Sequence, residues 1–244
     1  MPPQLFLTSL LNHLFAVPVD KLLALLHITP RFPESPIPNS VAMELLVFIA
    51  LMAYFIAVRV SLSVETPGAV QHIAEMTNEF VSDQGAQIIG HGSEQFTGYL
   101  TVLFLFILLS NLLGLVSPWL ESPTASLVVP AGLALVTFVY YHYYGIRANG
   151  IRYIKQFLGP VPLLYPLMLL IEVISHLARL LSLTVRLYAN MFAGDVLTLA
   201  FFSLIPIGIP VLFLGLHMFV AGIQAYVFML LTMIYLSLAV SHEH

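Results

Sequence analysis

The stretch PLMLLIEVISHLARLLSLTVRLYANMFAGDVLTLAFFSLIP, residues 166–206, decides the fold of this chain. Between its first and last prolines, residues 167–205 contain no proline and a single glycine, Gly194. As one helix these residues would be about 58 Å long. The hydrocarbon core of a bilayer is about 30 Å thick, and a tilt of about 40° does not absorb the excess. We therefore expect a helix that lies strongly oblique to the membrane or folds back.

A second overlong helix is predicted directly after the first. Pro206, Gly208 and Pro210 break the chain, and the apolar residues 211–240 come next, about 45 Å as a helix. Two overlong helices joined by a tight break predict an inclined antiparallel hairpin, formed by residues of about 163–205 and 211–240.

The composition places the rest of the chain in a membrane as well. Of its 244 residues, 59% are hydrophobic and 8% are charged, whereas a soluble domain has roughly 25% charged residues. The formal net charge of -4 offers no basic surface for nucleic acid. The chain has no cysteine, which excludes disulfides and thiolate metal sites. Soluble enzymes and nucleic-acid binders are therefore excluded, and no cofactor or metal is expected.

Three further spans precede the hairpin. They are predicted at about 41–62, 96–118 and 124–146, with a polar cytoplasmic loop at 63–95 whose residues 70–89 suggest a surface helix. The predicted fold is thus an all-α integral membrane protein with about five membrane-embedded helices in a single domain, 41–244. Residues 1–40 are expected to be an extracytoplasmic, interfacial segment, because Pro18, Asp20, Lys21 and the proline-rich residues 30–38 interrupt their apolar stretches.

The basic residues predict the orientation. Arg59 ends the first span, and Arg147, Arg152 and Lys155 follow the third, whereas only Lys21 and Arg31 fall on the opposite side. Since lysine and arginine are enriched in cytoplasmic loops, we expect the N-terminus outside and the C-terminus in the cytoplasm.

The first long helix contains ionisable residues that a membrane makes costly. Arginine, lysine or aspartate at the bilayer centre costs roughly 2.5–3.5 kcal/mol on insertion scales, and such residues are functional by default. At about 100° per residue, six polar side chains fall on one stripe roughly 80° wide. They are Glu172, Ser175, Arg179, Ser182, Arg186 and Asn190.

Asp195 lies about 180° from Arg186 on the same helix, so an ion pair between the two is not expected. In the second long helix, His217 and Gln224 are seven residues apart and share a face. An antiparallel hairpin turning at Gly208 would bring these two side chains to the depth of Asp195. A carboxylate and an imidazole at membrane depth suit proton transfer.

Structural roles compete with these functional ones. Arg179 could simply pair with Glu172, and Asp195 could be only a hydrogen-bonding group. His217 alone would more often be a satisfied structural histidine. Arg186 is the most difficult to explain structurally, because no obvious partner lies on its own helix.

The run RLYANMFAGD, residues 186–195, resembles the signature of subunit a of the F-type ATP synthase. NLLGLVSP at 111–118 is similar to the end of that family's second span, and QAYVFMLLTMIYLSLA at 224–239 is similar to its last helix. The resemblance implies a bacterial plasma-membrane subunit without nucleotide binding or catalysis of its own. Its implied partners are a ring of c subunits, the peripheral-stalk b subunits, the rest of the complex, lipid and protons.

The resemblance also implies roles for single residues. Arg186 corresponds to the essential proton-coupling arginine that faces the c ring. Asn190, Asp195, His217 and Gln224 match the half-channel open to the outside, and Glu172 and Ser182 match the other half-channel. Position 195 departs from the family pattern, because many bacterial relatives have glutamate there. The shorter aspartate leaves a gap that a water molecule could bridge.

Two other classes of function remain open from the sequence. A proton-coupled secondary transporter would use Arg186 to bind an anionic substrate and Asp195 with His217 for protons, although the chain has no internal repeat of the kind common in transporters. A purely structural subunit would use its buried charges to hold helices together. Substrate uptake in liposomes would support the transporter, and an assembly defect without a conduction defect would support the structural subunit.

Overall fold

The computed structural model describes residues 4–25, 27, 35–63, 68–116, 120–150, 153, 165–204 and 208–240. Within these ranges the chain forms seven α-helices and two short 3₁₀ turns and contains no strand, which confirms the predicted all-α class. The helices are α1 (Phe6–Leu25), α2 (Asn39–Val60), α3 (Ala69–Ile88), α4 (Glu94–Leu113), α5 (Val128–Asn149), α7 (Tyr165–Leu204) and α8 (Ile209–Val240). The 3₁₀ turns are η1 (Gly114–Val116) and η2 (Pro123–Ala125).

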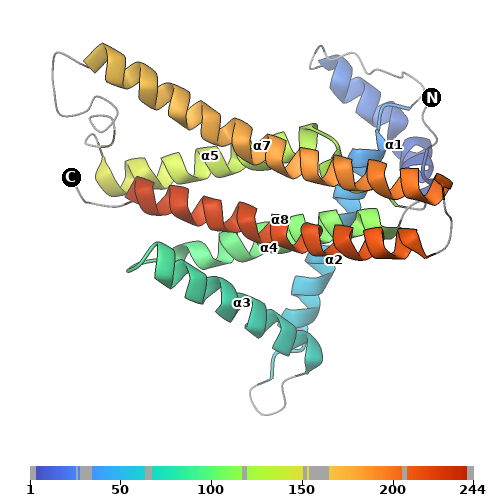
Figure 1. The fold of residues 1–244 in the computed structure, drawn as a ribbon, viewed down its shortest axis with the longest axis horizontal. Helices are drawn as coiled ribbons and strands as arrows, with labels where there is room; N and C mark the ends of the chain where they lie inside the picture. The colour runs from blue at the N-terminus through green and yellow to red at the C-terminus, as the bar shows by residue number, and fades with distance from the viewer. Residues whose placement is uncertain are drawn as a thin grey trace.

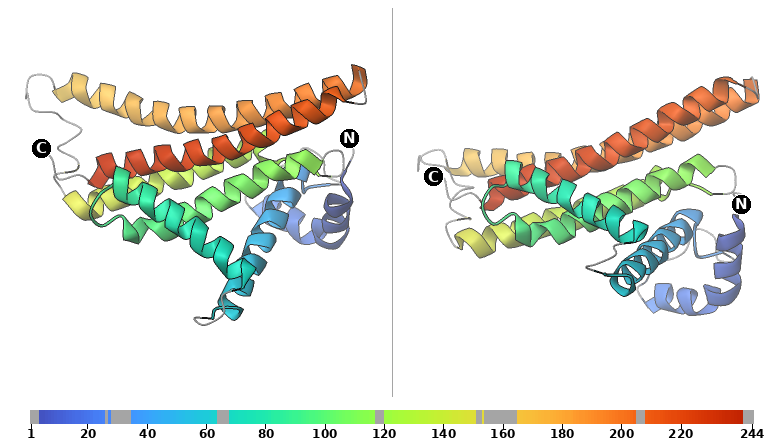
Figure 2. Two further views of the ribbon diagram at one scale, coloured as in Figure 1. Left: turned by 60° about the horizontal axis from the view of Figure 1, so that its bottom comes forward. Right: turned by 90° about the horizontal axis from the view of Figure 1, so that it is seen from below.

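The predicted hairpin is formed by α7 and α8, which run side by side along the long dimension of the molecule (Figure 1). They contain 40 and 32 residues, or about 60 and 48 Å of helix. Pro166 and Pro210 are the second residues of these helices, where the missing N–H removes no intrahelical hydrogen bond. Between the helices, Gly208 adopts a φ of 87°, a conformation open to glycine. Figure 2 shows that α7 is bowed, with its hollow side turned away from α4 and α5.

Four helical segments of the described residues are long and apolar enough to cross a membrane: Asn39–Val60, Glu94–Val116, Tyr165–Leu204 and Val211–Val240. The chain is therefore an integral membrane protein. The predicted span at 124–146 corresponds to α5, which is not among the four, because its second half contains tyrosines, His142 and Arg147.

The core lies between the hairpin and the helices beneath it. α8 is central, since it packs against α3, α4, α5 and α7. One group of buried side chains joins α8 to α4 and α5 through Met229, Met233, Phe96 and Tyr141. A second joins α7 to α4 and α8. The opposite face of α7 is exposed along most of its length, so the hairpin is covered on one side only.

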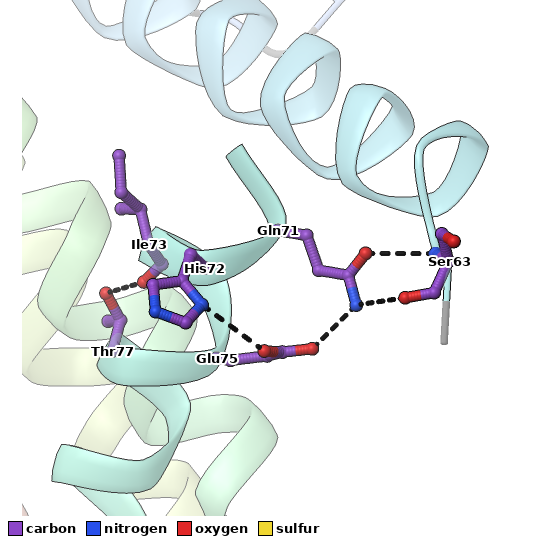
Figure 3. A network of polar contacts seen from close by, with 6 residues as sticks. All are labelled: Ser63, Gln71, His72, Ile73, Glu75 and Thr77. Atoms are coloured by element: carbon purple, nitrogen blue, oxygen red, sulfur yellow. Dashed lines mark hydrogen bonds and ion pairs between the residues drawn. The ribbon is translucent and has the colours of Figure 1, made fainter. Parts of the chain in front are cut away.

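The surface helix α3 is fixed to the end of α2 by the side chain of Gln71 (Figure 3). The amide of Gln71 accepts a hydrogen bond from Ser63 N at 3.0 Å and donates to Ser63 O at 3.1 Å. It also donates to Glu75 at 2.7 Å, and Glu75 lies 4.0 Å from the exposed His72. The polar side chains at this junction therefore fix the angle between α2 and α3, which diverge from it (Figure 1).

The N-terminal segment forms α1, a helix of 20 residues that contains Pro18. Proline in a helix removes one backbone hydrogen bond and strains the preceding turn without always ending the helix. α1 packs beside the beginning of α2 (Figure 1). Arg31, Arg152, Lys155 and Pro206, used above for orientation and for the break, lie outside the described residues.

Candidate functional site

The α7–α8 hairpin brings together the polar residues that the sequence singled out. Asn190 Nδ2 donates to Gln224 Oε1 at 2.8 Å. The Arg179 guanidinium lies 5.3 Å from the ring centre of Tyr235. Arg179 is eleven residues before Asn190 on α7, and Tyr235 is eleven residues after Gln224 on α8. The two helices are thus paired antiparallel in a constant register, and their polar side chains meet across one interface.

Asp195 and His217 meet across the same interface, nearer the turn. Oδ1 of Asp195 lies 3.9 Å from Nδ1 of His217, which is an ion-pair distance but too long for a direct hydrogen bond. The His217 side chain is 3% exposed, and that of Asp195 is 27% exposed. Within the described residues, Nε2 of His217 is buried without a hydrogen-bond partner. Both groups can exchange protons.

Two glycines make room for this pair. A Cβ on Gly194 would lie 2.8 Å from Nε2 of His217, closer than real Cβ atoms come to their neighbours. A Cβ on Gly114 would lie 2.9 Å from the Cβ of Ser122 and 3.3 Å from Oδ1 of Asp195. The imidazole therefore packs on the backbone of α7, and the carboxylate points toward the end of α4.

A buried hydrogen-bond network adjoins the pair, and the sequence did not predict it. Asn111 Nδ2 donates to the carbonyl of Ala221 on α8 at 3.1 Å, while its Oδ1 accepts from Thr124 at 2.7 Å. The hydroxyls of Ser122 and Thr124 are 2.7 Å apart, and Ser122 donates to Ser110 O at 3.0 Å. The signal available in the sequence was Asn111 itself, a polar amide in an otherwise apolar span.

A cavity of about 490 Å³ lies in front of Asp195. It is bounded by the N-terminal segment, the beginning of α2 and the region of η2. The lining residues are Gln4, Thr8, Ser35, Pro36, Ile37, Pro38, Asn39, Ser40, Glu121, Ser122, Ala125, Ser126 and Asp195. A cavity of this size and polarity can hold on the order of ten water molecules.

Arg186 occupies a different environment. It is exposed on the outward face of α7. Among the described residues, no hydrogen bond or ion pair involves its guanidinium. The neighbouring positions on this face carry small side chains that are also exposed: Ala178, Ser182, Ala189 and Ala193. Small residues at such spacing let a second helix approach closely.

At the other end of α7, Glu172 does not pair with Arg179, which corrects the structural alternative weighed above. Instead Oε1 of Glu172 lies 3.3 Å from Nε2 of His176, one turn further along. Nδ1 of His176 is 2.9 Å from the hydroxyl of the buried Tyr141 on α5. Sequence reasoning missed His176 and Tyr141, because neither lies on the polar stripe. Ser182, on the stripe, is exposed on the outward face.

The arrangement suits proton transfer between carboxylates, imidazoles and water. In the described part of the chain, no three histidine, aspartate or glutamate side chains lie close enough to hold a metal ion. The ionisable groups lie at two separate places, Asp195 with His217 near the turn and Glu172 with His176 near the start of α7, and the exposed Arg186 falls between them.

Comparison with known proteins identifies the family of this chain. The family model described as ATP synthase A chain matches residues 41–237. The chain is 54% identical to ATP synthase subunit a of Koribacter versatilis over 245 residues, covering 100% of both chains. It is 46% identical to ATP synthase subunit a of Solibacter usitatus over 223 residues, or 91% of this chain and 95% of the relative. A match of this extent and identity leaves one conclusion: the chain belongs to the ATP synthase A chain family.

Proposed function

We propose that this chain is the stator subunit of the membrane sector of an F-type ATP synthase. It provides two proton half-channels to and from a carboxyl group on a ring of c subunits, and Arg186 separates them. The chain performs no catalysis itself and acts within the complex, where the c ring and the peripheral-stalk b subunits are its partners.

The observation that carries the proposal is the environment of Arg186. A guanidinium on an apolar helix of membrane-spanning length is costly unless a counter-charge or water compensates it. Arg186 has no such partner among the described residues and faces outward. A carboxylate on a neighbouring helix would supply the missing counter-charge, and the adjacent small side chains would let that helix approach. Arginine suits this position because it stays charged when desolvated.

The spacing of ionisable groups along α7 supports two half-channels. Asp195 lies nine residues, or about 14 Å, beyond Arg186, and Glu172 lies fourteen residues, or about 21 Å, before it. Each of these distances is shorter than the hydrocarbon core, which is about 30 Å thick, so each carboxylate serves a path through only part of the membrane. Asp195, His217, Asn190 and Gln224 would form the outer half-channel. Glu172 and Ser182 would form the inner one.

The physical chemistry of a carboxyl group links these half-channels to rotation. A c-subunit carboxyl can face lipid only when it is protonated, because an ion there is very costly. A proton from one half-channel neutralises it and allows it to turn into lipid. After nearly a full turn it meets the other half-channel and releases the proton. The fixed charge of Arg186 stabilises the deprotonated carboxylate and repels protons that would otherwise leak directly between the channels.

The orientation that we propose puts the N-terminus and the cavity before Asp195 outside, with the C-terminus in the cytoplasm. Arg59 at the end of α2 and Arg147 at the end of α5 support it, because such residues are enriched at cytoplasmic helix ends. The membrane would be the bacterial plasma membrane.

Replacing Arg186 with alanine tests the proposal. We expect Arg186→Ala to abolish ATP-driven proton pumping and proton-driven ATP synthesis, while blue-native electrophoresis still detects the intact complex. Arg59→Ala is the matched control, an arginine on another helix of the same chain, and should keep coupling. A normal coupled rate in Arg186→Ala would refute the proposal, and loss of the assembled complex would favour a structural role.

A further inference from the structure

The cavity in front of Asp195 is closed on one side by the N-terminal segment, to which the proposed function assigns no role. Its lining includes Gln4, just before α1, Thr8 of α1 and the residues around the start of α2, together with Glu121 and Ser122. Asp195 is the only ionisable residue of α7 in the lining. The cavity therefore connects the N-terminal segment directly to the carboxylate of the proposed outer half-channel.

The N-terminal segment is fixed in this position by specific hydrogen bonds. Asn12 of α1 is 7% exposed and pairs with the backbone of Ile37 in both directions, donating to its carbonyl and accepting from its N–H, each at 3.0 Å. The N–H of Leu5 donates to Oδ1 of Asn39 at 3.4 Å. A side-chain amide that satisfies a backbone N–H and C=O together is a specific docking contact, because each of those groups would be costly to bury unpaired.

The cavity is large enough to hold water. At about 490 Å³ it has room for on the order of ten water molecules. Its lining includes Ser35, Ser40 and Ser126 as well as Glu121 and Asp195, residue types that form hydrogen bonds with water.

Glu121 provides a negative charge where the cavity reaches the surface. It is an exposed residue of the lining, and its Oε1 accepts a hydrogen bond from Asn39 Nδ2 at 3.2 Å. This bond links the connection between α4 and α5 to the beginning of α2, so the carboxylate is held beside the cavity. A carboxylate in this position raises the local concentration of protons and other cations.

From these contacts we infer that the N-terminal segment and Glu121 form a water-filled, proton-collecting vestibule that feeds Asp195. The inference rests on the proposed function and adds a role for the N-terminal segment. α1 supplies one wall, Asn12 fixes that wall to the start of α2, and Glu121 gathers protons at the mouth. Protons then pass along water to the half-buried Asp195 and on to His217.

The absence of cysteine from the chain allows a direct test of the vestibule. Ser40→Cys places a single thiol in the cavity lining, and Ser9→Cys places one on the exposed face of α1 outside it. A membrane-impermeant, cationic methanethiosulfonate reagent is applied from the outside to the assembled complex. Mass spectrometry measures modification, and the unsubstituted complex measures the effect of the reagent on other subunits.

Modification of Ser40→Cys should slow proton flux about tenfold, since it places a bulky cation in the path of protons. Modification of Ser9→Cys should leave the flux unchanged. The vestibule would be refuted if both thiols were completely modified and the two variants had equal proton fluxes, or if the reagent did not modify Ser40→Cys. If either result is found while Arg186→Ala still abolishes coupling, only the vestibule is refuted. Normal coupling in Arg186→Ala would instead refute the proposed function.

Glu121 is tested separately by its charge. Glu121→Gln keeps an oxygen that can accept the hydrogen bond from Asn39 but removes the negative charge, whereas Glu121→Asp keeps the charge. We expect the glutamine variant to lower proton flux by up to about tenfold, the lower end of electrostatic focusing, and the aspartate variant to restore most of it. Equal fluxes in wild type and Glu121→Gln would refute the collecting role.

Discussion

At the scale of single residues, Asp195 and His217 are separated by 3.9 Å between Oδ1 and Nδ1, so the pair interacts without a direct hydrogen bond. The resemblance found in the sequence implied such a gap, because it led us to expect glutamate, which is one methylene longer than aspartate, at this position. The glycines beside the pair allow its close packing, and Nε2 of His217 lies against the backbone of α7 at Gly194. The geometry suits proton transfer through water better than a fixed ion pair.

Substitutions of Asp195 test this account. Asp195→Glu lengthens the side chain across the gap and should keep ATP-driven proton pumping near the wild-type rate. Asp195→Asn has the same shape but cannot carry a proton, and it should slow pumping by about a hundredfold, the lower end of acid–base contributions. Pumping is measured by quenching of a pH-sensitive dye in inverted vesicles. Asp83→Asn, on the exposed surface of α3, is the control, and wild-type pumping in Asp195→Asn would contradict the account.

Replacing Gly194 with alanine tests the packing of the His217 imidazole on α7. Gly194→Ala would place its Cβ 2.8 Å from Nε2 of His217, so the ring must move. Such overpacking costs about 1–3 kcal/mol, which exceeds the gain of about 1 kcal/mol from alanine in a helix. We expect a lower thermal stability of the complex and slower pumping. Gly222→Ala, on α8, meets nothing within 4 Å and should be as stable as wild type or more so; equal behaviour of the two variants would be inconsistent with the packing described.

At the scale of helices, the α7–α8 hairpin follows from proline and glycine residues that are recognisable in the sequence as helix ends. Prolines stand at the second position of each helix, and Gly208 takes the positive φ of the turn. The antiparallel pairing of Asn190 with Gln224 and of Asp195 with His217 follows from that turn. α1 was not predictable in the same way, because Pro18 stops some helices and is tolerated in others, and the hydrogen bonds of Asn12 become visible only in three dimensions.

The junction of α2 and α3 allows a test at this scale. Gln71→Ala removes three hydrogen bonds of a residue that is 6% exposed, two of them to the backbone of Ser63. Each such bond contributes about 0.5–1.5 kcal/mol to stability. Hydrogen exchange in the last turn of α2 should therefore become faster. His72→Ala removes only an exposed contact of 4.0 Å and should change little. Equal exchange in both variants would show that Gln71 does not fix the junction.

At the scale of the whole molecule, hydropathy predicted the all-α membrane class, and helical periodicity grouped the polar residues of α7. Other features depend on segments far apart in the sequence. The Asn111–Thr124–Ser122 network joins α4, η2 and α8, and the cavity joins α1 to Asp195. His176 and Tyr141 belong to different helices, so no periodicity connects them. The outward position of Arg186 also required the structure, since the stripe alone did not say which of its members face the bundle.

The central claim, that Arg186 faces a helix of a neighbouring ring, is tested most directly by disulfide crosslinking. Ser182→Cys lies one turn before Arg186 on the exposed face of α7, and Thr184→Cys is the matched control on the buried face. Each is combined with a cysteine on the c-subunit helix that carries the carboxylate. Mild oxidation should crosslink Ser182→Cys to the c subunit and leave Thr184→Cys unlinked, because a disulfide requires Cα atoms about 4.4–6.8 Å apart. An intact complex in which Ser182→Cys does not crosslink, or crosslinks no more than Thr184→Cys, would contradict the claim.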